Sequence, residues 1–119
     1  MAAPNIFNPS NCTLARTSLA ATTAATAIVT NSAASNTAVR LTSLYVANVG
    51  NATASVTADI HNGTTVQSNI AFGISVPANA TLVVVTSESK VHLAEGESIR
   101  LTASANGTLQ GTASYEVLS

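Results

Sequence analysis

The chain has 119 residues, enough for one compact domain, and only 8% of them are charged, with a formal net charge of -1. A soluble domain averages about 25% charged residues. Four Lys and Arg residues cannot create the basic field that gathers nucleic-acid phosphates or an anionic membrane, so we expect neither as a partner. A hydrophobic content of 46% excludes a charge-driven disordered chain. The sequence also contains no apolar span of about 18 residues that would predict a transmembrane helix.

The first residues lack the basic and apolar regions of a secretory signal, and we interpret them as mature sequence. Cys12 is the single cysteine, which excludes an internal disulfide and a thiolate metal cage. Five Asn-x-Thr sequences occur, and in a chain so rich in Asn and Thr we interpret them as turn-forming sequences rather than glycosylation sites.

Residues 1–12 contain two prolines and three asparagines and are predicted to form an extended N-terminal arm. Within it, Ile6 and Phe7 form an apolar pair in polar surroundings. This pair either folds back on its own domain or docks into another subunit. Asn5, Ile6 and Phe7 are therefore the candidate partner-contact residues, and residues 13–119 are assigned to a single domain.

Apolar and polar residues alternate along most of that domain, as in strands with one buried face. The alternation is cleanest at 52–60, where Ala54, Val56, Ala58 and Ile60 are apolar, and again in the odd positions of 99–105 and 109–117. Residues 20–27 are rich in alanine, but the Thr residues among them and the following Ile28-Val29-Thr30 favour a strand over a helix. The predicted strands are 13–19, 25–31, 38–49, 52–61, 65–76, 80–86, 90–94, 97–105 and 108–118.

Turn residues separate these strands at short intervals, and the Asn62-Gly63 and Asn106-Gly107 pairs are the strongest hairpin signals. The apolar phase changes near Ser43, which predicts a β-bulge in the strand 38–49. Eight or nine short strands at this spacing predict an all-β, antiparallel β-sandwich. Its wiring is either jelly-roll or immunoglobulin-like.

Candidate chemical sites are few. Asp59 and His61 lie on one strand face, yet with His92 they are too few for a zinc site, and we interpret Asp59 and His61 as an exposed strand face beside a hairpin. Glu95 and Glu97 flank Gly96 in a turn, which is a poor setting for paired acid and base catalysis. The sequence contains no nucleophile elbow and no phosphate-binding glycine loop. We therefore expect no enzyme activity, no cofactor and no metal.

Aromatic residues are scattered, and Tyr45 and Tyr115 are predicted to lie in the core or at its edge. The low charge has a further implication. The exposed faces must be mostly Thr, Ser, Asn and Ala, which lose little ion hydration when another protein covers them. The composition therefore favours a protein that works within an assembly.

Four segments carry a family resemblance: TSLYVAN at 42–48, DIHNG at 59–63, VPANATLVVV at 76–85 and LAEGESIRLTASA at 93–105. They resemble small virion structural proteins of tailed bacteriophages, particularly cyanophages, and the likeness runs from about Ala24 to Glu116. The resemblance implies a non-enzymatic β-sandwich component of the virion, made in the host cytoplasm. It does not extend to the first 20 residues.

From the composition and the resemblance together we expect a capsid decoration or cement protein on the exterior of the shell. Its partner would be the major capsid protein or another virion subunit, and it would act as a homo-oligomer such as a trimer. A neck or tail component remains an alternative, and so does a receptor-binding or glycan-binding sandwich module, although clustered aromatics and calcium-binding acids are not apparent in the sequence.

Overall fold

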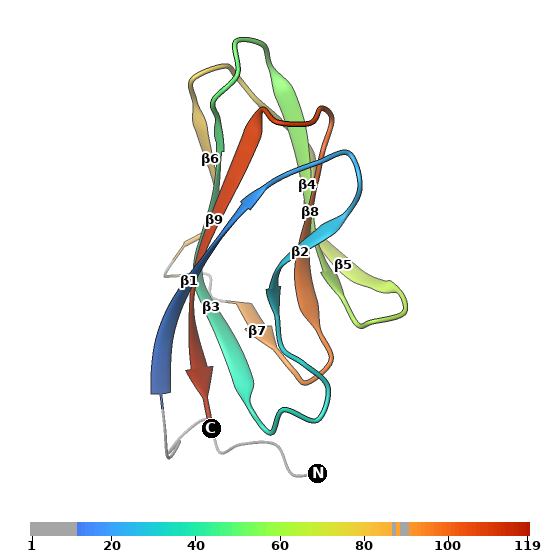
Figure 1. Cartoon of the computed structure of the whole chain (residues 1–119), viewed down its shortest axis with the longest axis vertical. Helices are drawn as coiled ribbons and strands as arrows, with labels where there is room; N and C mark the ends of the chain where they lie inside the picture. Colours follow the sequence, from blue (N-terminus) through green and yellow to red (C-terminus); the bar gives the residue numbers. More distant parts are fainter. Residues whose placement is uncertain (1–11, 87, 89–90) are drawn as a thin grey trace.

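The computed structural model describes residues 12–86, 88 and 91–119 (Figure 1). These residues form nine strands in two antiparallel sheets, and they contain no helix that is long and apolar enough to cross a membrane. The predicted all-β sandwich is confirmed. The candidate contacts Asn5, Ile6 and Phe7 lie outside the described residues.

Each strand begins and ends within two residues of its predicted bounds. The strands are β1 (Cys12–Ala20), β2 (Thr26–Thr30), β3 (Ala38–Asn48), β4 (Ala54–His61), β5 (Val66–Val76), β6 (Thr81–Val85), β7 (Val91–Leu93), β8 (Ser98–Ala103) and β9 (Leu109–Leu118). The residues 20–25 do not join β2, so the predicted strand there is restricted to its β-branched part.

The strand order distinguishes between the two predicted wirings. One sheet runs β1-β9-β3-β6, with β7 also paired to β3, and the other runs β2-β8-β4-β5. Since β6 and β7 share one partner strand, they act as a single interrupted strand. The pairs then lie one inside the next along the chain: β1 with β9, β2 with β8, β3 with the interrupted strand β6/β7, and β4 with β5. This is the topology of a jelly roll. The two sheets lie face to face as the layers of the sandwich (Figure 1).

The core lies between the sheets and follows the predicted alternation. Ile99, Leu101 and Ala103 are buried, whereas Ala105 lies beyond the end of β8 and is exposed. The pairing of β3 with β9 shifts between Leu41 and Ser43, which confirms the predicted bulge. The largest fully buried aliphatic side chains are those of Leu41, Leu44, Leu93, Ile99, Leu101, Leu109, Val29, Val46, Val56, Val76 and Val85.

Gly111 marks the closest approach between the two sheets along β9. A Cβ at this position would lie 2.4 Å from Leu101 Cδ1 and 3.2 Å from Ile28 Cδ1. Contacts of 2.4 Å do not occur between carbon atoms, so the neighbouring side chains fill the space that a larger residue would need. The glycine therefore allows β8 and β2 side chains to pack directly on the β9 backbone.

Two asparagines are buried and hold the ends of the strands, which the sequence pattern did not predict. Asn31 follows β2 and donates from Nδ2 to the carbonyls of Thr37 and Leu93, at 3.0 and 3.1 Å. Asn48 ends β3 and donates from Nδ2 to the carbonyls of Ala52 and Val76, at 2.8 and 2.9 Å. In both cases the side chain donates to backbone carbonyls of two different segments and links them at the end of the strands.

Candidate partner-binding surfaces

The outer side of the five-stranded sheet carries a surface without charge, which we call the neutral face. Register places Tyr45 opposite Val83 on β6 and opposite Thr112 on β9. The next row along the sheet pairs Ala47 with Thr81 and with Gln110. On β1, Ser18 pairs with Thr112 and Ala20 with Gln110. The neutral face consists of Ser18, Ala20, Tyr45, Ala47, Thr81, Val83, Gln110 and Thr112.

Apolar side chains project from this surface into solvent. Val83 is 56% exposed and Tyr45 is 40% exposed, so Tyr45, which was predicted to lie in the core or at its edge, projects outward from the sheet. The reason is the bulge in β3, because Leu44 and Val46 take the inward positions on either side of Tyr45. Tyr115 does pack against the core, as expected.

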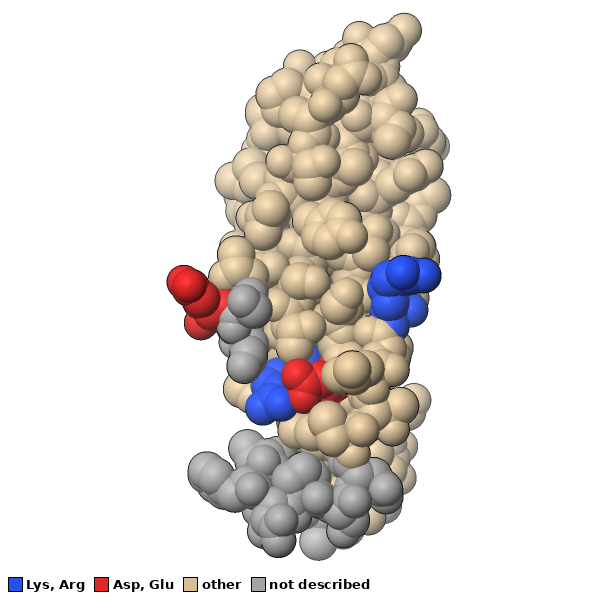
Figure 2. All heavy atoms as spheres, turned by 90° about the vertical axis from the view of Figure 1, so that its left-hand side faces the viewer, with Lys and Arg blue, Asp and Glu red and all other residues tan. Residues whose placement is uncertain are grey.

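The charged side chains of this sheet are Arg16 in the middle of β1, Arg40 of β3 and Glu116 of β9. Arg40 of β3 forms an ion pair and hydrogen bond with Glu116 of β9, its register partner. Figure 2 shows this side of the molecule, and among the described residues the upper part of the view carries no Lys, Arg, Asp or Glu. The neutral face is therefore bordered by Arg16, two residues before Ser18 on β1, and by the ion pair of Arg40 with Glu116.

Cys12 lies beside this ion pair at the start of β1. Its Sγ donates a hydrogen bond to Glu116 Oε2 at 3.4 Å. Partial desolvation, the hydrogen bond and the negative charge of Glu116 raise the pKa of the Cys12 thiol, in that order of size, and the charge of Arg40 opposes them. The thiol therefore stays protonated to higher pH than an isolated cysteine.

Strand β1 is the terminal strand of the five-stranded sheet, so its outer N–H and C=O groups have no strand partner within the described part of the chain. All nine of its residues pair with β9 without a register shift. Leu14 is 77% exposed on this strand, and Arg16 is exposed without an ion pair to any described residue. A shallow hollow of about 490 Å³ lies between Leu14, Arg16 and Ser114.

The four-stranded sheet ends at β5, whose edge is built differently. Gly73 has φ +59°, and its N–H donates to Thr57 Oγ1 at 3.0 Å. The pairing with β4 shifts here, between the pairs of Val56 and of Ala58. This bulge leaves Phe72 projecting from the strand, 74% exposed. Bulges of this kind bend an edge away from continuous pairing, so β5 is a poorer template for another strand than β1.

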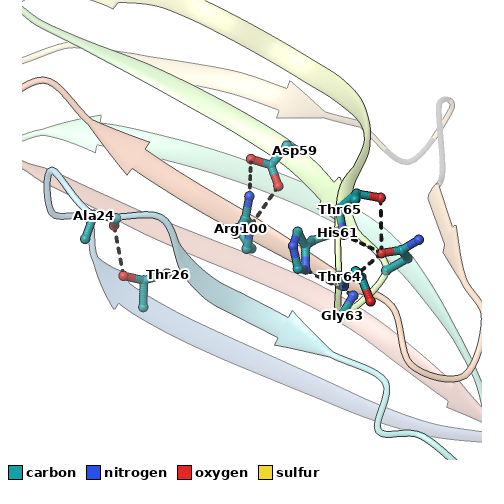
Figure 3. A network of polar contacts seen from close by, with 9 residues as sticks. Ala24, Thr26, Asp59, His61, Gly63, Thr64, Thr65 and Arg100 are labelled. Carbon is teal, nitrogen blue, oxygen red and sulfur yellow. Dashed lines mark hydrogen bonds and ion pairs between the residues drawn. The ribbon is translucent and has the colours of Figure 1, made fainter.

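The predicted chemical candidates do not form a site. Asp59 is only 4% exposed and its carboxylate accepts from Arg100 Nε at 2.9 Å and Nη2 at 3.3 Å (Figure 3), so the expectation of an exposed Asp59 was wrong. Its charge is offset by a residue of the neighbouring strand, which sequence alternation cannot reveal. His61 Nδ1 accepts instead from Gly63 N–H at 3.0 Å. The described residues contain no group of three or more His, Cys, Asp or Glu that could hold a metal.

The two turn glutamates have structural contacts. Glu97 Oε1 accepts from Ala94 N–H at 2.8 Å, within its own turn. Glu95 Oε2 accepts from Asn36 N–H at 3.1 Å and so links two loops. The carboxylates are therefore used to satisfy backbone donors at the end of the sandwich.

No protein-family model matches this chain, and no curated protein matches it in sequence. Solved structures do share its fold. A chain of the disulfide-linked pili that form Bacillus endospore appendages is 11% identical with a TM-score of 0.54, over 91% of this chain and 85% of that one. A chain of the acidic stable capsid of Helicobacter pylori bacteriophage KHP30 is 10% identical with a TM-score of 0.54, over 94% and 90%. These likenesses establish a shared fold.

Proposed function

We propose that the protein is a non-enzymatic structural subunit of a bacteriophage virion, a decoration or cement protein that binds the exterior of the capsid and stabilises it. The observation that carries the proposal is the neutral face. Eight neighbouring outward positions on four strands lack any charge, and two of them expose a valine and a tyrosine. A free surface normally carries about 25–35% charged residues.

Such a face suits burial against another protein. Covering Thr, Ser, Ala and Gln side chains removes no ion hydration, and Tyr and Val supply apolar contact area. Aromatic side chains in the centre of an interface commonly contribute most of its binding energy. Tyr45 lies in the middle of the row that runs from Ser18 to Val83, which makes it the expected anchor.

The fold likenesses support the same proposal. Both matched chains come from assemblies, a pilus and a phage capsid. The jelly roll is also a recurrent architecture of viral capsid domains, although it serves lectins and other proteins too. Together with the resemblance to small phage virion proteins, these findings favour a capsid location over the neck or tail.

The proposed mechanism is stabilisation by mass action. A protein that binds only the assembled shell lowers the free energy of the shell relative to its separate subunits. The major capsid protein is the proposed partner, with the protein bridging neighbouring subunits as a homo-oligomer such as a trimer. Residues 1–12, with Asn5, Ile6 and Phe7, are proposed as the attachment arm.

The experiment is reconstitution on capsids that lack the protein, with occupancy measured by quantitative gel analysis and cryo-electron microscopy. Val83→Glu should lower the affinity at least about tenfold, because it buries an unpaired carboxylate in the proposed interface. The matched control is Val66→Glu, since Val66 is also an exposed valine on an edge strand but belongs to the opposite sheet. This control should bind like the wild type.

Other results would overturn parts of the proposal. Loss of binding in Val66→Glu but not in Val83→Glu would assign the interface to the other sheet. Undiminished occupancy after deletion of residues 1–12 would remove the arm from the mechanism. Wild-type protein that does not bind capsids, but is located by labelled antibody at the neck, tail or receptor-binding fibres, would reject the decoration role.

A further inference from the structure

The hairpin between β4 and β5 contains an asparagine with unusual surroundings. Asn62 Oδ1 accepts hydrogen bonds from the backbone N–H groups of Thr64 and Thr65, at 2.9 and 2.7 Å. The next residue, Gly63, donates its own N–H to Nδ1 of His61 at 3.0 Å. Figure 3 shows these contacts together at the tip of the hairpin, where residues 62–65 are exposed to solvent.

These hydrogen bonds involve the atoms that react when an asparagine side chain is attacked by its own backbone. In that reaction the backbone nitrogen of the following residue attacks Cγ of the asparagine side chain. The attack needs a base to take the proton from that nitrogen, and it places negative charge on Oδ1. Here Nδ1 of His61 already accepts a hydrogen bond from Gly63 N–H, and two backbone N–H groups already point at Oδ1.

We infer that Asn62-Gly63 is a site of self-catalysed deamidation, in which His61 acts as the base and the Thr64 and Thr65 amides stabilise the oxyanion. This inference is independent of the proposed capsid role. The reaction requires only the hydrogen bonds of this hairpin and the water that reaches it.

The steps balance without any added oxidant or cofactor. His61 takes the proton of Gly63 N, and the nitrogen forms a bond to Asn62 Cγ, giving a tetrahedral intermediate with its negative charge on Oδ1. The intermediate collapses as the bond from Cγ to Nδ2 breaks, and Nδ2 leaves as ammonia after taking the proton back from His61. The product is a five-membered succinimide ring. One water molecule then opens the ring to aspartate or isoaspartate.

The conformation of Gly63 makes the ring closure feasible. Gly63 has φ +93°, and a Cβ at this residue would have only Gly96 O within 4 Å, at 3.6 Å. A residue without a side chain rotates with little steric cost. Closing the ring requires rotation about the bond from Asn62 Cα to its carbonyl carbon, and the open surroundings of the hairpin permit that rotation.

The same chain contains a matched control. Asn106-Gly107-Thr108 repeats the sequence Asn-Gly-Thr of residues 62–64 and is also exposed at its first two positions. Asn106 Oδ1 accepts one backbone N–H, that of Thr23 at 2.9 Å. Within the described part of the chain, no side chain accepts from Gly107 N–H. The two sites therefore share the same local sequence, but among the described residues only Asn62 has a neighbouring base and a second N–H donor to its Oδ1.

The test is incubation of the purified full-length protein at near-neutral pH, followed by peptide mapping with mass spectrometry that separates aspartate from isoaspartate. General-base catalysis gives about 10²–10⁴-fold in evolved enzymes, and a hairpin that must rotate before closure should reach about tenfold. We expect Asn62 to convert about tenfold faster than Asn106 in the folded protein. In denaturant the two sites should convert at similar rates.

His61→Gln is the decisive variant, because the glutamine side chain can still accept the Gly63 hydrogen bond but is not a base. It should slow Asn62 to about the rate of Asn106 and leave Asn106 unchanged. Equal rates at the two sites in the folded wild type would overturn the inference, and that comparison needs no variant. An unchanged or faster rate at Asn62 in His61→Gln would also overturn the role of His61.

Discussion

The buried Asn48 side chain provides the sharpest test of what holds the end of the sandwich. Asn48→Ala removes three hydrogen bonds: two from Nδ2 to the carbonyls of Ala52 and Val76, and one from Gly50 N–H to Oδ1 at 2.9 Å. Each hydrogen bond contributes about 1 kcal/mol net, so the loss of all three should lower the free energy of unfolding by about 3 kcal/mol. For a domain of this size the melting temperature should fall by about 12 °C.

Urea denaturation followed by circular dichroism measures this change, since the chain has no tryptophan. Asn51→Ala is the control because Asn51 lies three residues away and is exposed, and it should change the free energy of unfolding by less than about 0.5 kcal/mol. Asn48→Asp should be at least as harmful as Asn48→Ala, since a carboxylate would face two carbonyl oxygens. A loss below about 1 kcal/mol in Asn48→Ala would refute the reasoning, because the backbone groups would then have found other partners.

Three further predictions concern other parts of the molecule. Arg100→Ala leaves the buried Asp59 carboxylate without its partner and should lower the free energy of unfolding by about 2–3 kcal/mol, measured by urea denaturation. Gly111→Ala places a Cβ 2.4 Å from a core leucine of β8 and should cost about 1–3 kcal/mol by the same measurement; a neutral effect would show that the core yields there. Because its pKa is raised, the Cys12 thiol should be alkylated more slowly at pH 8 than a free cysteine. Glu116→Gln should lower that pKa and so accelerate the reaction. Mass spectrometry of quenched samples measures the rates.

Strand number and strand position follow from local patterns, which is why sequence alternation predicted them well. Alternation identifies a strand with one buried face regardless of its neighbours, and Asn-Gly pairs mark where strands end. The wiring is different, because β1 pairs with β9 across almost the entire chain. Pairing over such distances leaves no local signal, so jelly-roll and immunoglobulin-like arrangements could not be distinguished from the sequence.

The errors of the sequence prediction arise from the same non-local contacts. Asp59 follows the polar phase of its strand, yet it is buried, and the partly exposed Arg100 neutralises it from 41 residues away. Tyr45 was predicted to lie in the core or at its edge because it lies in an apolar run, and the strand register shows that its side chain faces outward. The neutral face could not be predicted for this reason, since it assembles outward residues from four strands.

The contrast between the two long edge strands bears on how the protein assembles. Exposed edges pair with other strands unless something interrupts them, and β5 has such an interruption in the bulge at Gly73. Strand β1 has none: it pairs regularly over nine residues, contains no proline, and exposes Leu14 beside Arg16. An edge that has no strand partner among the described residues and adjoins an uncharged face would promote aggregation in a free protein. A partner that covers both would remove that hazard. Arg16 adds a criterion for the partner, because it has no ion pair with any described residue and would favour a neighbouring carboxylate. It disfavours a second β1 strand centred on the same residue, where two arginines would lie directly opposite each other. The edge therefore disfavours the symmetric register in which two β1 strands are centred on Arg16.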